Sequence, residues 1–395
     1  MNQYNSPTLS LKSLFSTYQF IQVGLFAYYL AFLPIYLADI GNSPKEIALI
    51  SLFTTISIML AGPITQEISH SYLSPKNLNN FFEFSSIIAF LTFICVRDFY
   101  ALSIVWPLFM FCRMGSQILI DSELVHHNFK GGLKFERIRV WGSIGFILLS
   151  FLLGIIFKNF NSLNGTLAII PIIIALSITS FRLSNHLEPL QEYSISKKAI
   201  LKIFKNQNIM ILLLCVSLMW IAHTPLYIYL SLYLERLGFK SSEISIIWNL
   251  GVLAEICFFL LFTFLEKYFT VLNILKSCLF LAIFRWYILY TFTSYPWFIV
   301  AQIFHAFSFA AIYICSTKLI YQYFPVDLKH KSQAYLSFLG IGVGSLLGRL
   351  IISVAAENLN DYLDVQNLFW FSLIISILAF TFSLLLKEEK ATLNC

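Results

Sequence analysis

Four ionisable side chains interrupt otherwise apolar runs in the second half of the chain. They are His223 in MWIAHTPLY, Glu255 in GVLAEICFF, Arg285 in AIFRWYI and His305 in AQIFHAFSF. A charge at the centre of a membrane helix costs roughly 2.5 to 3.5 kcal/mol, so such residues usually face a partner or a cavity. Carboxylates and imidazoles exchange protons in such places, and arginine binds anions. The pattern predicts either a proton-linked site or a structural ion pair between Glu255 and Arg285. Our hypothesis is that Glu255 carries the proton and that Arg285 and His305 set its affinity.

Helical spacing places aromatic and polar side chains beside these four residues. Three faces result: Trp220, His223, Tyr227 and Ser231; Trp248, Gly251, Glu255 and Phe259; and Gln302, His305 and Phe309. At 1.5 Å per residue, the four ionisable groups lie roughly 12 to 16 Å below the outer ends of their helices. Rings beside hydrogen-bonding groups suit a small organic ligand. We expect substrate to bind at His223, Tyr227, Trp248 and Gln302, with ordinary core packing as the alternative for the rings.

The first half of the chain has fewer buried polar residues. Arg113, Gln117 and Asp121 fall on one stripe of a single expected helix. Arg113 either binds a substrate anion, with Gln117 beside it, or pairs with Asp121 through a water molecule. Three charged residues near the ends of expected helices should extend to the membrane interface: Glu83, Glu123 and Arg349.

The composition requires that these residues lie in a membrane protein. Of 395 residues, 58% are hydrophobic and 12% charged, with 40 phenylalanines and a mean hydropathy of +0.77. This excludes a soluble globular protein. A membrane helix needs about 20 mainly apolar residues. Twelve such segments are predicted, so the fold class is an all-α membrane protein: 14–38, 45–67, 80–96, 100–122, 138–157, 166–183, 208–234, 244–265, 273–293, 296–318, 332–354 and 367–386.

Basic residues fall mainly on one side of these segments. With the N-terminus inside, eighteen lysines and arginines lie in inner loops and five in outer loops. Inner loops hold the excess, so both termini are predicted to be cytoplasmic. The net charge of +6 reflects this asymmetry, and no nucleic-acid partner is expected. We expect no signal peptide, and the spacing of the seven cysteines indicates no metal site.

The longest break between segments divides the chain into two halves. It predicts a six-helix bundle at 1–183, a cytoplasmic linker at 184–207 and a second bundle at 208–395. Transporters commonly alternate access to a central site between two such halves. Each half also has a glycine-bearing helix, WGSIG from Trp141 and GIGVGSLLG from Gly340, where we expect close helix packing.

Several motifs together resemble the phenylpropionate permease family of the major facilitator superfamily, over all twelve helices. The carrying residues are Pro34, Tyr36 and Leu37 with Gly41, Ser43 and Pro44; Asp121 with Arg139, Trp141, Gly142 and Ser143; His223 with Tyr227; LGVLAE ending at Glu255; Arg285 with Trp286; Gln302 with His305; and Gln333 with Tyr335.

The resemblance implies a twelve-helix major facilitator fold and proton-linked uptake of small organic solutes across the bacterial inner membrane. It implies no cofactor besides the proton gradient, and we expect a monomer in the lipid bilayer. Glu255, Arg285 and His305 occupy the helices that bear the coupling Glu, Arg and His of the similar lactose and nucleoside proton symporters. On the same resemblance we assign Asp121, Arg139 and Trp141 to the conformational change.

These observations predict a proton symporter for a small solute, and aromatic carboxylates such as 3-phenylpropionate are the leading substrates. A sugar or a nucleoside is the alternative within this class. A membrane-embedded transferase is the alternative from another class, because buried histidine and carboxylate can act as acid and base. We expect a transporter and not an enzyme, since the polar groups lie at mid-depth and the loops are short.

Overall fold

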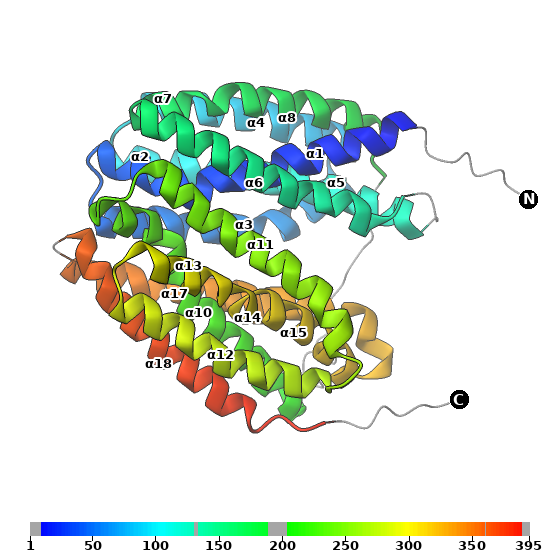
Figure 1. Cartoon of the computed structure of the whole chain (residues 1–395). Coiled ribbons are helices and arrows are strands. Elements are labelled where there is room, and N and C mark those ends of the chain that lie inside the picture. The colour runs from blue at the N-terminus through cyan, green and yellow to red at the C-terminus, as the bar shows by residue number, and fades with distance from the viewer. Residues whose placement is uncertain (1–8, 130–132, 189–203, 360, 389–395) are drawn as a thin grey trace, which may run out of the picture. The chain divides into compact units, whose positions relative to one another are not determined.

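The computed structural model describes residues 9–129, 133–188, 204–359 and 361–388, and all regular structure within them is helical (Figure 1). The chain divides into two compact units. The first comprises residues 1–192 with 239–245, and the second residues 193–238 with 246–395. Of the linker expected at 184–207, residues 189–203 lie outside the described part of the chain.

The first unit is built from helices that mostly run the full length of a membrane span. They are α1 (Leu9–Ala27), a π-helix η1 (Tyr28–Phe32), α2 (Leu33–Asp39), α3 (Pro44–Ser71), α4 (Pro75–Cys95), α5 (Phe99–Phe129), α6 (Phe135–Asn159), α7 (Ser162–Leu167), α8 (Ile169–Leu183) and the short η2 (Ser184–His186). Within this unit α1 and α6 run side by side (Figure 1).

The second unit has more irregular helices. They are α10 (Gln207–Arg236), most of α11 (Ser241–Leu265), α12 (Val271–Thr291), α13 (Tyr295–Ile303), α14 (His305–Ser308), α15 (Ala310–Tyr323), η3 (Val326–Lys331), α16 (Ser332–Tyr335), a π-helix η4 (Leu336–Gly342), α17 (Val343–Ala355), η5 (Ala356–Asn358), η6 (Tyr362–Asp364) and α18 (Val365–Ser383). Here α10 packs along α18 and α17.

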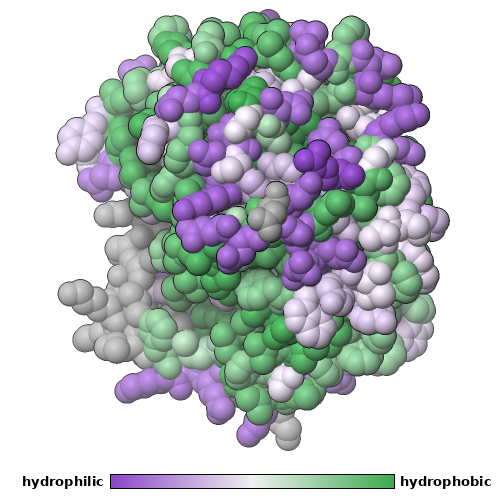
Figure 2. Space-filling view, turned by 90° about the vertical axis from the view of Figure 1, so that its left-hand side faces the viewer, coloured by the Kyte–Doolittle hydropathy of each residue, from purple (hydrophilic) through white to green (hydrophobic). Residues whose placement is uncertain are grey.

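The prediction of twelve membrane segments is confirmed. Eleven helices in the described residues are long and apolar enough to cross a membrane, and a bent pair, Tyr295–Ile303 with His305–Tyr323, supplies the twelfth. Large apolar side chains lie exposed along these helices, such as Ile104 at 68% and Leu260 at 74%, as expected of surfaces that face lipid. Figure 2 views one end of the helices, where hydrophilic side chains gather beside hydrophobic ones.

The G-x-S-P motif starts α3. Gly41 has φ of +98°, a conformation that favours glycine. The hydroxyl of Ser43 accepts a hydrogen bond from the backbone N–H of Glu46 at 3.3 Å, and the Glu46 carboxylate accepts one from the Ser43 N–H at 2.7 Å. Pro44 then occupies the first turn, where its missing N–H costs nothing. The motif is therefore a turn followed by a helix cap.

Both glycine motifs lie where helices approach closely, as expected. A Cβ on Gly145 of α6 would lie 1.9 Å from the carbonyl oxygen of Phe20 in α1. A Cβ on Gly344 of α17 would lie 2.7 Å from the Cα of Ser217 in α10. Small residues at these crossings allow backbone-to-backbone packing, which is the main attraction between helices in lipid.

Candidate substrate and proton site

A break in the tenth membrane segment positions two polar side chains of the site. The segment bends by 40° between α13 and the helices that follow. His305 begins the short α14 and Ser308 ends it, and the Ser308 hydroxyl donates to the His305 carbonyl oxygen at 3.2 Å. Residues 301–312 include no proline or glycine, so the break has no signal in the sequence. Interrupted membrane helices commonly form ion and substrate sites.

Glu255 and His305 form the closest charged contact of this region. His305 Nε2 lies 2.8 Å from Glu255 Oε1, and the two side chains are 8% and 18% exposed. Gly251 of α11 lies against this contact, and a Cβ there would lie 3.0 Å from Gln302 Oε1 and 3.1 Å from His305 Cδ2, which is tight packing. The other ring nitrogen of His305, Nδ1, is buried with no hydrogen-bond partner among the described residues.

Arg285 is fully buried and bonds to a different set of groups. Its Nη1 donates to Ser308 Oγ at 2.9 Å and lies 2.9 Å from His223 Nε2. Its Nε donates to the Ala301 carbonyl oxygen at 3.2 Å. The guanidinium also lies 4.8 Å from the ring centre of Trp286, a cation–π contact.

These contacts fix the protonation of His223. Its Nδ1 lies 2.7 Å from the carbonyl oxygen of Met219, which can only accept, so Nδ1 carries the hydrogen. Its Nε2 faces the Nη1 of Arg285, which can only donate, so Nε2 accepts. His223 is therefore neutral with one tautomer held in place, whereas the proton between His305 and Glu255 is not fixed in this way.

The structural ion pair between Glu255 and Arg285, the alternative left open by the sequence, is contradicted. Within the described residues Glu255 pairs with His305, while the Arg285 guanidinium bonds to His223, Ser308 and Ala301. The two charges still interact electrostatically across the cluster. All four predicted ionisable residues are brought together, but in a different pairing.

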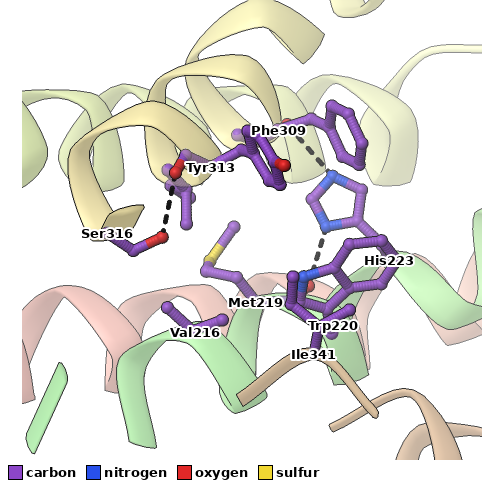
Figure 3. A pocket seen from close by; sticks show the side chains of 10 residues that line it. Val216, Met219, Trp220, His223, Phe309, Tyr313, Ser316 and Ile341 are labelled. Atoms are coloured by element: carbon purple, nitrogen blue, oxygen red, sulfur yellow. Dashed lines mark hydrogen bonds between the residues drawn. The ribbon is translucent and has the colours of Figure 1, made fainter. Parts of the chain in front are cut away.

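A small pocket adjoins this cluster within the second unit (Figure 3). His223 and Phe309 lie next to each other at one end, and Trp220 lies beside them. The Trp220 and Phe309 rings meet edge to face at 5.7 Å between centroids. Ser308 also lines the pocket, so two groups that bond to Arg285 form part of its wall.

Three predicted substrate residues lie beside the pocket. Tyr227 stacks on His223 with ring centroids 5.7 Å apart, and Trp248 stacks on Tyr227 at 6.4 Å. Trp248 Nε1 donates to Ser231 Oγ at 3.0 Å. Gln302 does not line the pocket, and its Oε1 is 3.5 Å from Arg285 Nη2. Ser308 was missed, although it stands three residues after His305 in the sequence.

In the first unit Arg113 is buried in an ion pair with Glu83. Its Nη1 lies 2.5 Å from Glu83 Oε2, and the side chains are 1% and 0% exposed. Glu83 also accepts hydrogen bonds from Ser116 and Ser177 at 2.6 Å each. The prediction that Glu83 reaches the interface is wrong, because α4 presents this carboxylate to a buried arginine on α5.

A hydrogen-bonded chain leads from this ion pair to Asp121. Arg113 Nη2 donates to Gln22 Oε1 at 2.6 Å, Gln22 donates to Gln117 at 3.0 Å, and Gln117 donates to Asp121 at 3.2 Å. Gln19 also donates to Asp121. Side chains of α1 therefore replace the water expected between Arg113 and Asp121. The sequence did not reveal this link because Gln19 and Gln22 lie 91 to 102 positions from their partners.

Two other residues expected to extend to the interface are buried by protein contacts. Glu123 is 4% exposed; it accepts from the Glu188 N–H at 2.9 Å and lies 3.3 Å from His127 Nε2. Arg349 of α17 is 8% exposed, and its Nη1 donates to the Ser345 carbonyl oxygen at 3.3 Å. Arg349 also interacts electrostatically with Tyr227, which brings a further positive charge toward the aromatic stack.

The residues assigned to the conformational change lie at the junction of α5 and α6. Arg139 is exposed and interacts electrostatically with Asp121. Trp141 is 45% exposed. Gly142 follows, where a Cβ would lie 2.9 Å from Arg139 Nη1, so the glycine leaves room for this arginine.

Comparison with known proteins identifies the family of this chain and its relatives. The profile of the MFS_1 like family matches residues 11–358. A protein described as a probable 3-phenylpropionic acid transporter of Escherichia coli (strain K12) is 25% identical over 379 residues, which cover 91% of this chain and 95% of that protein.

Solved structures show the same fold. The nucleoside transporter NupG matches with a TM-score of 0.80 and 18% identity, covering 96% of this chain and 100% of that one. A bacterial homologue of the iron transporter ferroportin in an inward-facing state matches with a TM-score of 0.74 and 15% identity, covering 97% and 100%. With twelve membrane segments and a family match over most of its length, this multi-pass membrane protein belongs to the MFS_1 like family and is a transporter rather than an enzyme.

Proposed function

We propose that the protein takes up a small aromatic carboxylate, such as 3-phenylpropionate, together with a proton, by alternating access at the bacterial inner membrane. The contact that carries this proposal is the 2.8 Å pair between Glu255 and His305 beside a buried arginine. The similarity to the probable 3-phenylpropionic acid transporter supports the substrate class.

The geometry supports one exchangeable proton in this cluster. His223 is held neutral between Met219 and Arg285, so it contributes no titration of its own. Glu255 and His305 share a short contact in which a proton can lie on either partner, and the His305 Nδ1 has no partner among the described residues. We therefore assign proton coupling to Glu255 with His305, and the orientation of the site to Arg285 and His223.

The pocket beside the cluster suits the carboxylate and ring of such a substrate. Ser308 and His223 form the wall in front of Arg285, and Trp220 and Phe309 offer ring faces. The charge of Arg285 lies one hydrogen bond behind that wall and favours an anion there. Tyr227, Trp248 and Gln302 would hold the wall in place through stacking and hydrogen bonding.

The charges in the site predict the number of protons transported with each substrate. Arg285 and ionised Glu255 together are neutral, and a bound carboxylate adds one negative charge. One proton on the Glu255–His305 pair restores neutrality, which lowers the electrostatic cost of moving the loaded site through an occluded state. We therefore propose one proton for each monocarboxylate, so that transport carries no net charge.

The experiment is proton uptake by vesicles reconstituted with the purified protein. Aryl carboxylates, other organic acids, sugars and nucleosides are added in turn, and protein-free vesicles correct for passive entry of protonated acid. We expect proton entry with 3-phenylpropionate and the same rate when a membrane potential is imposed. Flux with a nucleoside or a sugar alone would contradict the substrate class, and absence of flux with every solute would contradict symport.

A further inference from the structure

The chain continues past its last membrane helix and packs against one end of the second unit. Helix α18 ends at Ser383, and residues 384–388, which we call the strap, follow it without further helix. Leu385 is 54% exposed, whereas Leu386 is 2% exposed and belongs to the hydrophobic core shared by α10, α12 and α15. The strap therefore completes the core at this end of the unit.

Three membrane helices form hydrogen bonds with the backbone of two consecutive strap residues. Lys276 Nζ of α12 donates to the Leu386 carbonyl oxygen at 3.0 Å. The Tyr323 hydroxyl of α15 donates to the Lys387 carbonyl oxygen at 3.0 Å, and the Lys387 N–H donates to Asn208 Oδ1 of α10 at 3.1 Å. Backbone groups outside regular structure need partners, and here each partner comes from a different helix. The strap thus links α10, α12 and α15.

Two interruptions separate α15 from the start of its own membrane segment. The segment bends by 40° before His305. Phe309, directly before α15, has φ of −120° and ψ of −69°, outside the helical range. Residues at the ends of helices can act as hinges, because they absorb changes in backbone angles. The position of α15 therefore depends on its side-chain packing and on its far end, where Tyr323 meets the strap.

The same helix forms part of the wall of the small pocket beside the buried cluster. Tyr313 and Ser316 of α15 line this pocket, and Met219 of α10 lines it from the facing helix (Figure 3). The turn from Tyr313 to Ser316 lies between the interruption before α15 and the strap contact at Tyr323. A displacement of the last turn of α15 would therefore also move the pocket wall.

We propose that the strap restrains α15, and that its release allows this helix to move away from α10 and to widen the pocket. Phe309 serves as the hinge, and the contacts of Tyr323 and Leu386 hold the opposite end. The proposal concerns a conformational change of the second unit and does not depend on which solute the site binds. It assigns the strap an effect on a pocket wall that it does not itself line.

The test is hydrogen–deuterium exchange of the full-length protein in lipid nanodiscs, followed by mass spectrometry of overlapping peptides. Tyr323→Phe keeps the ring and removes the hydroxyl that bonds to the strap. Loss of one hydrogen bond changes a local opening equilibrium by roughly fivefold, so the amides from Tyr313 to Ser316 should exchange roughly fivefold faster. Tyr321→Phe, at a 52% exposed position of the same helix, is the matched control and should leave this exchange unchanged.

A second pair of variants changes the strap itself. Leu386→Ala removes a buried side chain and should raise exchange of the same turn by about tenfold or more. Leu385→Ala, at an exposed position of the strap, is its matched control and should have no such effect. Exchange in α13, on the other side of the bend, should stay unchanged in all four variants, which separates release of α15 from a general loss of stability.

Three outcomes would overturn the proposal. Faster exchange confined to residues 320–323 would show that the strap only caps the end of α15. Equal increases in α13 and α15 would show general destabilisation of the unit. Unchanged exchange in Tyr323→Phe would show that the strap contact does not restrain α15, and this variant decides the question even if Leu386→Ala does not fold.

Discussion

Arg285 donates a hydrogen bond to Nε2 of His223 at 2.9 Å, and this contact distinguishes the two buried histidines. An acceptor bound by a guanidinium cannot also hold a proton, so His223 stays neutral. His305 faces the carboxylate of Glu255 instead, at 2.8 Å. We therefore propose an orienting role for His223 on α10 and a proton-exchanging role for His305 on α14.

The first prediction concerns these two histidines. His223→Gln should weaken substrate affinity, because a flexible amide holds Arg285 less firmly than the fixed ring does, while the shape of the pH profile is retained. His305→Gln should flatten the dependence of uptake on pH between about 5 and 8, the range in which histidine usually titrates. Initial uptake rates in reconstituted vesicles measure both. A flat profile in His223→Gln with a normal one in His305→Gln would reverse the assignment.

A second prediction concerns the buried pair of Glu83 and Arg113. Removing one partner leaves a buried charge uncompensated, which costs on the order of 3 to 5 kcal/mol. Glu83→Gln and Arg113→Gln should each lower the midpoint of thermal unfolding strongly. The double variant should lose less stability than the two single losses combined. Additive losses would show that the two side chains do not interact.

A third prediction concerns the contact between α1 and α6. Gly145→Ala would place a Cβ 1.9 Å from the Phe20 carbonyl oxygen, so α1 and α6 would have to move apart. We expect the free energy of unfolding of the protein to fall by about 1 to 3 kcal/mol or more. Gly62→Ala in α3 is the matched control, because its Cβ would meet only ordinary contact at 3.8 Å. Thermal unfolding of the two variants measures the difference, and equal midpoints would contradict this helix crossing.

A fourth prediction concerns the acidic residue Asp361, in the loop between the last two membrane segments. The hydrogen bond from Arg236 Nε, at 2.9 Å, lowers the pKa of Asp361 below its ordinary value. A lowered pKa in the folded state gives stability above the ordinary pKa of an aspartate, and this stability is lost as the pH falls through the lowered value. Asp361 therefore stays ionised between about pH 5 and 8.

The variant Asp361→Asn tests that conclusion. It should leave the pH profile of uptake unchanged between about pH 5 and 8, and should remove part of the acid-dependent loss of thermal stability below about pH 4. A changed uptake profile would show that this loop, rather than the buried cluster alone, titrates during transport.

Much of the fold could be predicted because the lipid bilayer imposes length and apolarity on each segment. The two glycine motifs were also readable, since close packing in lipid selects small residues at short spacing. The bend before His305 could not be predicted, because no proline or glycine marks it in the sequence. It depends on contacts between helices that are distant in sequence.

The sequence predicted which residues form the site but not which of them contact one another. Glu255, Arg285, His223 and His305 stood out because each is costly in an apolar helix. Which of them touch depends on the rotation of each helix, and the sequence does not specify rotation. Glu83 shows the same limit. The predicted segment 80–96 placed it near a helix end, whereas α4 begins at Pro75 and the partner of Glu83 comes from α5.

The most direct test of the central claim is uptake by vesicles carrying Glu255→Gln, with and without an inward-directed proton gradient. The amide keeps the shape of Glu255 but cannot release a proton. We predict that the variant loses gradient-driven accumulation of 3-phenylpropionate and retains exchange of labelled for unlabelled substrate. Glu243→Gln, at the start of the same helix, is the matched control and should accumulate normally. Undiminished accumulation by Glu255→Gln would contradict the claim that Glu255 carries the coupled proton.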